Sequence, residues 1–269
     1  MKIPGKELIP YWLGEKLRGA WQRYLSLKYK GTDYHCPYCG NSFKKFLPGG
    51  TDLPVLTEKM IIGGGFRDNL LCPRCFSVDR DRLIYLYLKE KTNIFSARLK
   101  ILHIAPEGCI RSLLMSLPNT DYHSGVKYFE GYYYDRKVKL IDVTSLQFES
   151  ESFDVVICNH VLEHVHDDQK ALEEIHRILK PNGWAILQVP ISDKLGETEY
   201  DPSISTPEDR EKIYGQHDHV RIYGQDYPKF LERNGFKVVQ YSPFHDSPQE
   251  TVKKFALNPK EKLFVAYKV

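Results

Sequence analysis

The sequence contains no run of eighteen apolar residues, so we expect no membrane-spanning helix. Its opening residues, MKIPGKELIPYW, lack the apolar core of a secretory signal, and we therefore expect a cytoplasmic location. Internal repeats and low-complexity tracts are also absent. The 269 residues are enough for one large domain with a real core and a small additional module.

The formal net charge is small, at +3, but the charged residues are unevenly distributed along the chain. Residues 1–30 carry seven Lys/Arg and two Glu, whereas residues 96–269 carry 22 Lys/Arg and 26 Asp/Glu. Apolar residues recur at steps of three and four over residues 7–29, which predicts a basic amphipathic helix in residues 1–30. Such a helix either packs on the neighbouring module or lies on an anionic membrane surface, and a basic surface also suits nucleic acid.

The six cysteines are not spaced as a disulfide framework. Four of them form two pairs, CPYC at Cys36 and Cys39 and CPRC at Cys72 and Cys75. Two such turns can complete a tetrahedral site of four thiolates, so we predict a structural Zn²⁺ ion; a redox dithiol is the alternative. Residues 31–95 would form this zinc module and a connecting helix that Ser77 can cap.

From residue 99 onward, strand-like runs such as KILHI and FDVVICN alternate with helical ones. This alternation predicts an α/β domain with a mostly parallel sheet and helices on both faces. Parallel sheets bind ligands at the carboxyl ends of their strands. The turn that follows the first strand, Ala105–Cys109, should therefore lie at the mouth of the site.

Residues 140–190, from LIDVTSLQF to ILKPNGWAILQVP, resemble class I S-adenosylmethionine-dependent methyltransferases in the order and spacing of their motifs. The resemblance covers about residues 98–269 and implies a Rossmann-like seven-stranded sheet in a methyltransferase domain, residues 96–269. It also implies that Asp142, with Val143 beside it, meets the adenine of the cofactor. Asn159 and His160 fall in the family's cofactor-facing loop.

The first strand and its loop depart from the family pattern. His103 stands in place of the family's acidic residue, and Ala105, Glu107 and Cys109 occupy the three glycine positions. Glu107 could meet the cofactor's amine, while the amides that open the next helix at Gly108 meet its carboxylate.

The second strand departs as well. Lys127 stands at the position of the ribose-binding carboxylate, and Glu130 could replace that carboxylate from nearby. The paired cysteines together with LHIAPE also resemble a bacterial subgroup of these enzymes that has a zinc-binding segment before the domain.

Residues 191–224 are long for a connection and contain the motif HDHVR. We predict that His217, His219 and Arg221 line an acceptor pocket, with Arg221 orienting a polar substrate group. His164, His217 and His219 are candidate bases. A metal held by the His-x-His motif has no evident third ligand, and a structural turn is the other alternative.

The sequence thus predicts an S-adenosylmethionine-dependent methyltransferase that acts on oxygen or nitrogen of a small-molecule or sugar-type acceptor. An RNA methyltransferase that uses the zinc module for RNA binding is the first alternative. A non-catalytic binding module on the same scaffold is the second.

Overall fold

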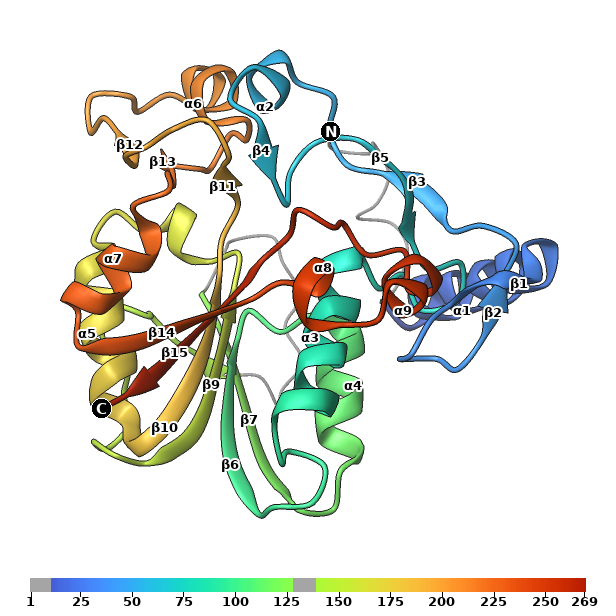
Figure 1. The fold of residues 1–269 in the computed structure, drawn as a ribbon, viewed down its shortest axis with the longest axis horizontal. Helices are drawn as coiled ribbons and strands as arrows, with labels where there is room; N and C mark the ends of the chain where they lie inside the picture. The colour runs from blue at the N-terminus through green and yellow to red at the C-terminus, as the bar shows by residue number, and fades with distance from the viewer. Residues whose placement is uncertain (1–10, 128–138) are drawn as a thin grey trace.

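The computed structural model describes residues 11–127 and 139–269, and a seven-stranded sheet is the centre of the described fold (Figure 1). Its strand order is β14-β15-β10-β9-β6-β7-β8. In that order the strands span Phe236–Tyr241, Leu263–Lys268, Leu179–Gln188, Phe153–Asn159, Leu99–Ile104, Thr120–Val126 and Lys139–Leu140. Strand β15 is antiparallel to both neighbours, and the pairs from β10 to β8 are parallel. The prediction of a mostly parallel seven-stranded sheet is confirmed.

Helices cover both faces of the sheet, as the near-continuous apolar strands require. Helices α3 (Asp79–Lys91) and α4 (Gly108–Ser116) lie on one face, and α5 (Asp168–Ile178) and α7 (Tyr227–Arg233) lie on the other (Figure 1). Alternate strand residues divide between the two cores: Ile101 and Ile157 pack with α3 and α4, whereas Leu102 and Val156 pack with α5. The same alternation points His103 towards the face of α3 and α4.

The paired cysteines lie in a small module beside the sheet. It contains four short strands: β1 (Lys30–His35), β2 (Ser42–Phe43), β3 (Leu47–Gly49) and β5 (Arg67–Leu71). Phe43 and Phe46 are buried against Cys36 and Cys72 and form its core. The C-terminal helix α9 (Gln249–Lys254) lies against this module, while α8 (Pro243–Asp246) precedes it (Figure 1).

Two segments far apart in the sequence form a cap over the carboxyl ends of β9 and β10. The cap consists of residues 50–66, with α2 (Pro54–Glu58) and β4 (Ile61–Ile62), and residues 191–224. The second segment contains β11 (Ile191–Ser192), β12 (Glu199–Tyr200), α6 (Pro207–Tyr214) and β13 (Arg221–Ile222). Strand β4 pairs with β11, and α2 contacts α6 (Figure 1). Packing therefore crosses the predicted boundary at residue 96, and that boundary stays a prediction.

One local expectation differs from the structure. Ser77 does not cap α3, because the helix begins at Asp79 and the Asp81 carboxylate accepts a hydrogen bond from the Val78 N–H at 2.9 Å. The Ser77 hydroxyl instead lies 3.2 Å from the Cys36 sulfur. A hydroxyl that is engaged with a sulfur atom is not available to cap a helix.

The N-terminal helix α1 spans Tyr11–Lys28 and is only partly packed. Leu25 is buried, whereas Leu17, Trp21 and Tyr24 are more than half exposed. Contact of this helix with an anionic membrane surface stays a prediction. Among the described helices, none is long and apolar enough to span a membrane.

Candidate functional site

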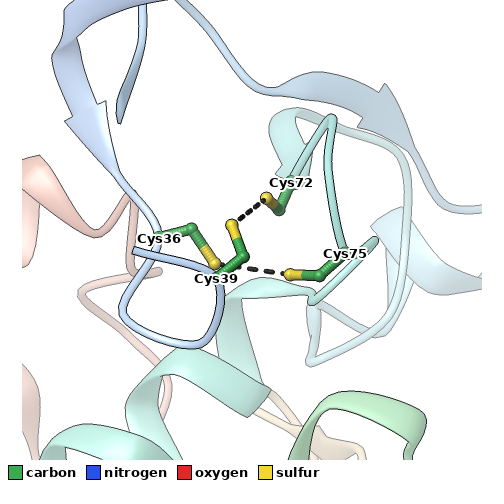
Figure 2. Close-up of side chains that lie close together, drawn as sticks. All are labelled: Cys36, Cys39, Cys72 and Cys75. Carbon is green, nitrogen blue, oxygen red and sulfur yellow. Dashed lines mark hydrogen bonds between the residues drawn. The ribbon is translucent and has the colours of Figure 1, made fainter. Parts of the chain in front are cut away.

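The four cysteines of the two CxxC motifs converge at the ends of β1 and β5 (Figure 2). Each motif forms the same tight turn, in which the amide four residues after the first cysteine donates to that cysteine's carbonyl. Gly40 and Phe76 end these turns with φ angles of 67° and 58°. The sulfur atoms of Cys36 and Cys75 are 3.5 Å apart, and those of Cys39 and Cys72 are 3.7 Å apart. Tetrahedral zinc–thiolate bonds would put sulfurs roughly 3.8 Å apart, so the cluster fits Zn²⁺.

The surroundings of the cysteines suit anionic sulfur. The Arg74 amide lies 3.4 Å from the Cys72 sulfur and donates to it. Hydrogen bonds from Cys39, Cys72 and Cys75 lower the pKa of Cys36, because neighbouring thiols stabilise the first thiolate that forms. Four protein ligands leave no open position, so the metal would be structural. Metal binding itself stays a prediction.

The cofactor edge that the resemblance implies begins at the end of β6. Ala105 has a φ angle of 50°, a left-handed conformation that glycine adopts more easily. The Ala105 amide donates to the Gly125 carbonyl at 2.8 Å, which fixes the turn beside β7. An ideal Cβ at Gly108 would meet nothing within 4 Å, so the space before α4 is open in the described residues.

Glu107 turns back towards the sheet. Its carboxylate lies 2.8 Å from His103 Nε2, and His103 Nδ1 lies 3.1 Å from the Tyr122 hydroxyl. Burial raises the pKa of Glu107, but the hydrogen bond and charge of His103 outweigh it and the net shift is downward. His103 therefore holds an ionised Glu107 at the position where the resemblance implies the cofactor's amine.

The neighbouring strand ends carry the other predicted cofactor residues. Asn159 ends β9 and is buried, and neither amide atom of its side chain has a hydrogen-bond partner within the described chain. Asp142 is exposed after β8 and its Oδ1 accepts hydrogen bonds from the Thr144 amide and hydroxyl at 2.9 and 2.7 Å. Val143 is buried beside it, and Lys127 follows β7 and lowers the pKa of Asp142 as a minor effect behind the Thr144 hydrogen bonds. Glu130 lies outside the described residues.

A pocket of about 360 Å³ lies between the carboxyl end of β9 and the cap. Of the residues predicted to line an acceptor pocket or serve as a base there, the structure brings His164, His219 and Arg221 to this wall, together with His160. His217 is exposed and is not part of the pocket wall.

Arg221 lines the pocket, but its guanidinium contacts protein acceptors. It donates to the carbonyls of Val165 and His166 at 2.8 and 2.7 Å and forms an ion pair with Asp168. These contacts tie β13 to the 3₁₀ turn η2 (Leu162–His164) and to α5. We therefore expect Arg221 to position the pocket wall rather than to orient a substrate group, which revises the sequence-based expectation.

Sequence reasoning missed two residues of the same pocket, Glu163 and Arg80. Glu163 lies within the LEHV motif that follows β9, and Arg80 lies five residues after the second CxxC motif, in the first turn of α3. The Arg80 side chain forms no hydrogen bond in the part of the chain that the structure describes, and its Nε is buried. The position of Arg80 shortly after the CPRC motif could have indicated a site residue, because a turn held by the cysteines would fix the direction of the segment that follows it.

Burial is the largest single influence on the pKa of each pocket histidine. Burial and the charge of Arg80 lower the pKa of His160, and burial likewise lowers the pKa of His219. Burial also opposes protonation of His164, but the hydrogen bond to Asp218 and the charge of Glu163 raise its pKa overall. At neutral pH, His160 and His219 are therefore neutral and can accept a proton.

A family model described as a methyltransferase domain matches residues 121–187, from β7 almost to the end of β10. The match covers about a quarter of the chain and includes Asp142, Asn159, His160 and the LEHV motif. No protein of curated function matches the sequence.

Solved structures share the architecture at low similarity. A 1,6-didemethyltoxoflavin-N1-methyltransferase from Burkholderia thailandensis, with its substrate and S-adenosylhomocysteine bound, is 14% identical with a TM-score of 0.44; the alignment covers 71% of this chain and 87% of that one. An Archaeoglobus fulgidus S-adenosylmethionine-dependent methyltransferase is 17% identical with a TM-score of 0.43, covering 69% and 93%.

The CurJ carbon methyltransferase is 17% identical with a TM-score of 0.43, covering 71% of this chain and 53% of its own, so this chain spans about half of its length. Likenesses this weak say nothing about the acceptor.

Proposed function

We propose that this chain, an S-adenosylmethionine-dependent methyltransferase by its α/β domain, methylates a polar atom of a small molecule held in the pocket beside His160. The observation that carries the proposal is the position of that pocket. It adjoins the carboxyl end of β9, the strand whose loop faces the cofactor in the family that the sequence resembles. Its volume is in the range of small-molecule sites.

The residues at the cofactor edge fit S-adenosylmethionine, which supplies an electrophilic methyl group on a sulfonium when bound. Asn159 has a buried amide whose donor and acceptor atoms need a partner. The open space before Gly108 leaves the first amides of α4 accessible to a carboxylate. Asp142 Oδ1 is occupied by Thr144, and Oδ2 is the oxygen that we assign to the adenine amino group.

Among the histidines, His160 is best placed to act as the base for an acceptor. Its Nδ1 lies 3.2 Å from a carboxylate oxygen of Glu163, while its Nε2 is buried without a partner among the described residues. The negative charge of Glu163 beside Nδ1 favours a proton on that nitrogen, which leaves the free electron pair of the neutral ring on Nε2. His164 and His219, which line the same wall, are alternatives.

A small molecule suits this site better than RNA. The pocket is lined on one side by Gly63, Gly64 and Gly65 of the first cap segment and on the other by residues of the second cap segment, such as Tyr214 and His219. A pocket enclosed by two segments of the chain admits a small acceptor more readily than a polynucleotide chain. RNA stays the alternative, and a steep fall of RNA affinity with salt would favour it.

Calorimetry with S-adenosylhomocysteine tests the proposal and supplies the first prediction. We expect Asp142→Ala to weaken binding by about 1–3 kcal/mol, because it removes a charged acceptor. Asp201→Ala is a matched control: Asp201 Oδ1 accepts hydrogen bonds from the Ser203 amide and hydroxyl at the same 2.9 and 2.7 Å. Its turn lies in the cap, so affinity should not change. If the wild type shows no binding at millimolar ligand, the non-catalytic alternative replaces this proposal.

A further inference from the structure

Three potential metal ligands converge on the wall of the acceptor pocket. Glu163 and His164 lie in η2, directly after β9, and His219 precedes β13. One ligand atom from each residue lies within 4.8 Å of the others. The Val220 amide donates to the Glu163 carbonyl at 2.9 Å and holds the two segments together. The three side chains are therefore brought together by main-chain contacts that need no metal.

The Glu163 carboxylate lacks the partners that a buried charge requires. Its side chain is only 2% exposed, and neither oxygen has a hydrogen-bond partner within residues 11–127 and 139–269. His160 Nδ1 lies 3.2 Å from Oε1 but is not aligned to donate a hydrogen bond. A buried carboxylate without hydrogen bonds is unfavourable unless a cation compensates it. The oxygens of Glu163 are thus available for a positively charged ligand.

The two histidines are oriented as metal ligands usually are. His164 Nδ1 lies 3.3 Å from a carboxylate oxygen of Asp218, which leaves Nε2 as the nitrogen that can bind a metal. A carboxylate behind a ligating imidazole fixes both its tautomer and its direction. The rings of His164 and His219 meet edge to face with centroids 4.7 Å apart, so the two imidazoles pack directly against each other.

We propose that Glu163, His164 and His219 bind a divalent metal ion of the zinc type, at a second site distinct from the four cysteines. Two imidazoles and one carboxylate are a ligand set of catalytic zinc sites, which keep a fourth position open. Mg²⁺ is disfavoured because it prefers oxygen ligands throughout. All three residues line the pocket, so the open position faces the space that we assign to the acceptor.

The role of this metal rests on the proposed function, whereas its binding does not. A metal at this position would hold the oxygen of a hydroxyl acceptor and lower the pKa of that hydroxyl. The hydroxyl proton passes to His160 Nε2, and the oxygen forms a bond to the methyl carbon as the carbon–sulfur bond breaks. The electron pair of that bond stays on sulfur, which becomes a neutral thioether. The substrate class is therefore a small molecule with an acidic or activated hydroxyl.

Elemental analysis tests the site. Untagged full-length protein is equilibrated with excess Zn²⁺, desalted and measured for bound metal. We expect two zinc ions per chain in the wild type and one in Glu163→Gln and in His219→Ala. His217→Ala is the matched control and should keep two, because His217 is an exposed neighbour outside the pocket wall. Circular dichroism verifies that each variant is folded.

A single zinc ion in the wild type, or two in both Glu163→Gln and His219→Ala, would overturn the proposal. Cobalt substitution identifies the sites separately, since only the cysteine centre gives thiolate-to-metal charge-transfer bands. If Glu163→Gln does not fold, cobalt titration of the wild type still decides: a second equivalent without charge-transfer intensity supports the site, and saturation at one contradicts it. Binding of S-adenosylhomocysteine is measured in parallel. A wild type that binds only one zinc ion but binds S-adenosylhomocysteine rejects this inference alone, whereas a wild type that binds two zinc ions but not that ligand rejects the proposed function alone.

Discussion

Ala105 and His160 end neighbouring parallel strands with φ angles of 50° and 51°. A left-handed conformation costs a non-glycine residue roughly 1 kcal/mol or more. Both residues lie at the sheet edge where the cofactor is expected, and no other part of β6 or β9 is in this conformation. Residues in such strained backbone conformations are most common at functional sites, where the surrounding structure stabilises them. At the first of the three glycine positions, Ala105 therefore adopts a backbone conformation that glycine adopts more easily.

Arg80 lies between the cofactor edge and the acceptor pocket. Its charge lowers the pKa of His160 and, as a minor effect, that of Glu107, so it is close to both parts of the site. We expect it to hold the carboxylate of the cofactor's methionine part. Arg80→Ala should then weaken S-adenosylhomocysteine binding at least about tenfold in calorimetry, the worth of a charge-assisted hydrogen bond, and Arg80→Lys should restore part of it.

Arg98→Ala is the control for this substitution, because Arg98 is exposed before β6, at the opposite end of the sheet. Affinity in Arg80→Ala equal to that in Arg98→Ala would show that Arg80 does not contact the cofactor.

At the scale of elements, the second CxxC turn joins β5 to α3 and thereby directs the start of that helix. Arg82 in its first turns is fully buried and donates to the carbonyls of Ser77, Leu70 and Phe255 at 2.6, 3.1 and 2.6 Å. Burial lowers the pKa of Arg82, while the negative charges of Asp79 and the cysteines oppose that shift. The zinc turn, α3 and the end of α9 therefore depend on one another.

Cys72→Ser should remove the structural zinc and loosen this junction. Because metal-binding free energy in such modules is folding free energy, we expect a loss of about 3–5 kcal/mol in urea unfolding and one zinc ion fewer by elemental analysis. Cys109→Ser is the control, since Cys109 is a free cysteine outside the cluster that donates to Asp81 at 3.3 Å. Unchanged zinc content in Cys72→Ser would contradict the assignment of the four ligands.

At the scale of the whole molecule, Glu261 is buried between the end of β10 and the first segment of the cap. Its Oε1 accepts a hydrogen bond from Gln188 at 2.7 Å, and the Gly63 backbone lies beside it. Burial, followed by the charge of Asp79, raises the pKa of Glu261 to about 7, although Arg67 and Arg80 oppose the shift. The folded protein therefore binds this proton more tightly than the unfolded chain does.

This linkage makes stability depend on pH. Between the ordinary value of 4.5 and about 7 the folded state holds the proton that the unfolded state has lost, so the free energy of unfolding falls as pH rises. The ionised carboxylate costs about 3 kcal/mol above pH 7. Glu261→Gln should remove this cost, so its stability relative to the wild type should grow between pH 5 and 8 in urea unfolding. A difference that is constant over this range would contradict the buried titration.

The sequence by itself determined the seven-stranded sheet and the pairing of the four cysteines that the structure brings together. Apolar runs such as KILHI and FDVVICN and the CxxC spacings act over a few residues, so local chemistry specifies them without knowledge of the chain path. The family resemblance, rather than local patterning, implied that Asp142 and Asn159 lie at strand ends. Local reasoning misjudged Ser77, because the cluster that engages the hydroxyl forms only when two distant turns meet.

Tertiary structure alone decided the composition of the pocket. The cap joins distant segments, as in the contact of Lys59 with Ser192, which are 133 residues apart, and such long-range contacts form one side of the pocket. It also supplied Glu163 as the third partner of His164 and His219, which the His-x-His motif did not reveal. We expected Arg221 to contact the substrate, but its guanidinium contacts Asp168 and two backbone carbonyls and so supports the pocket wall. The physical reason is that a side chain's role depends on the groups that surround it, and sequence spacing does not fix which distant groups these are.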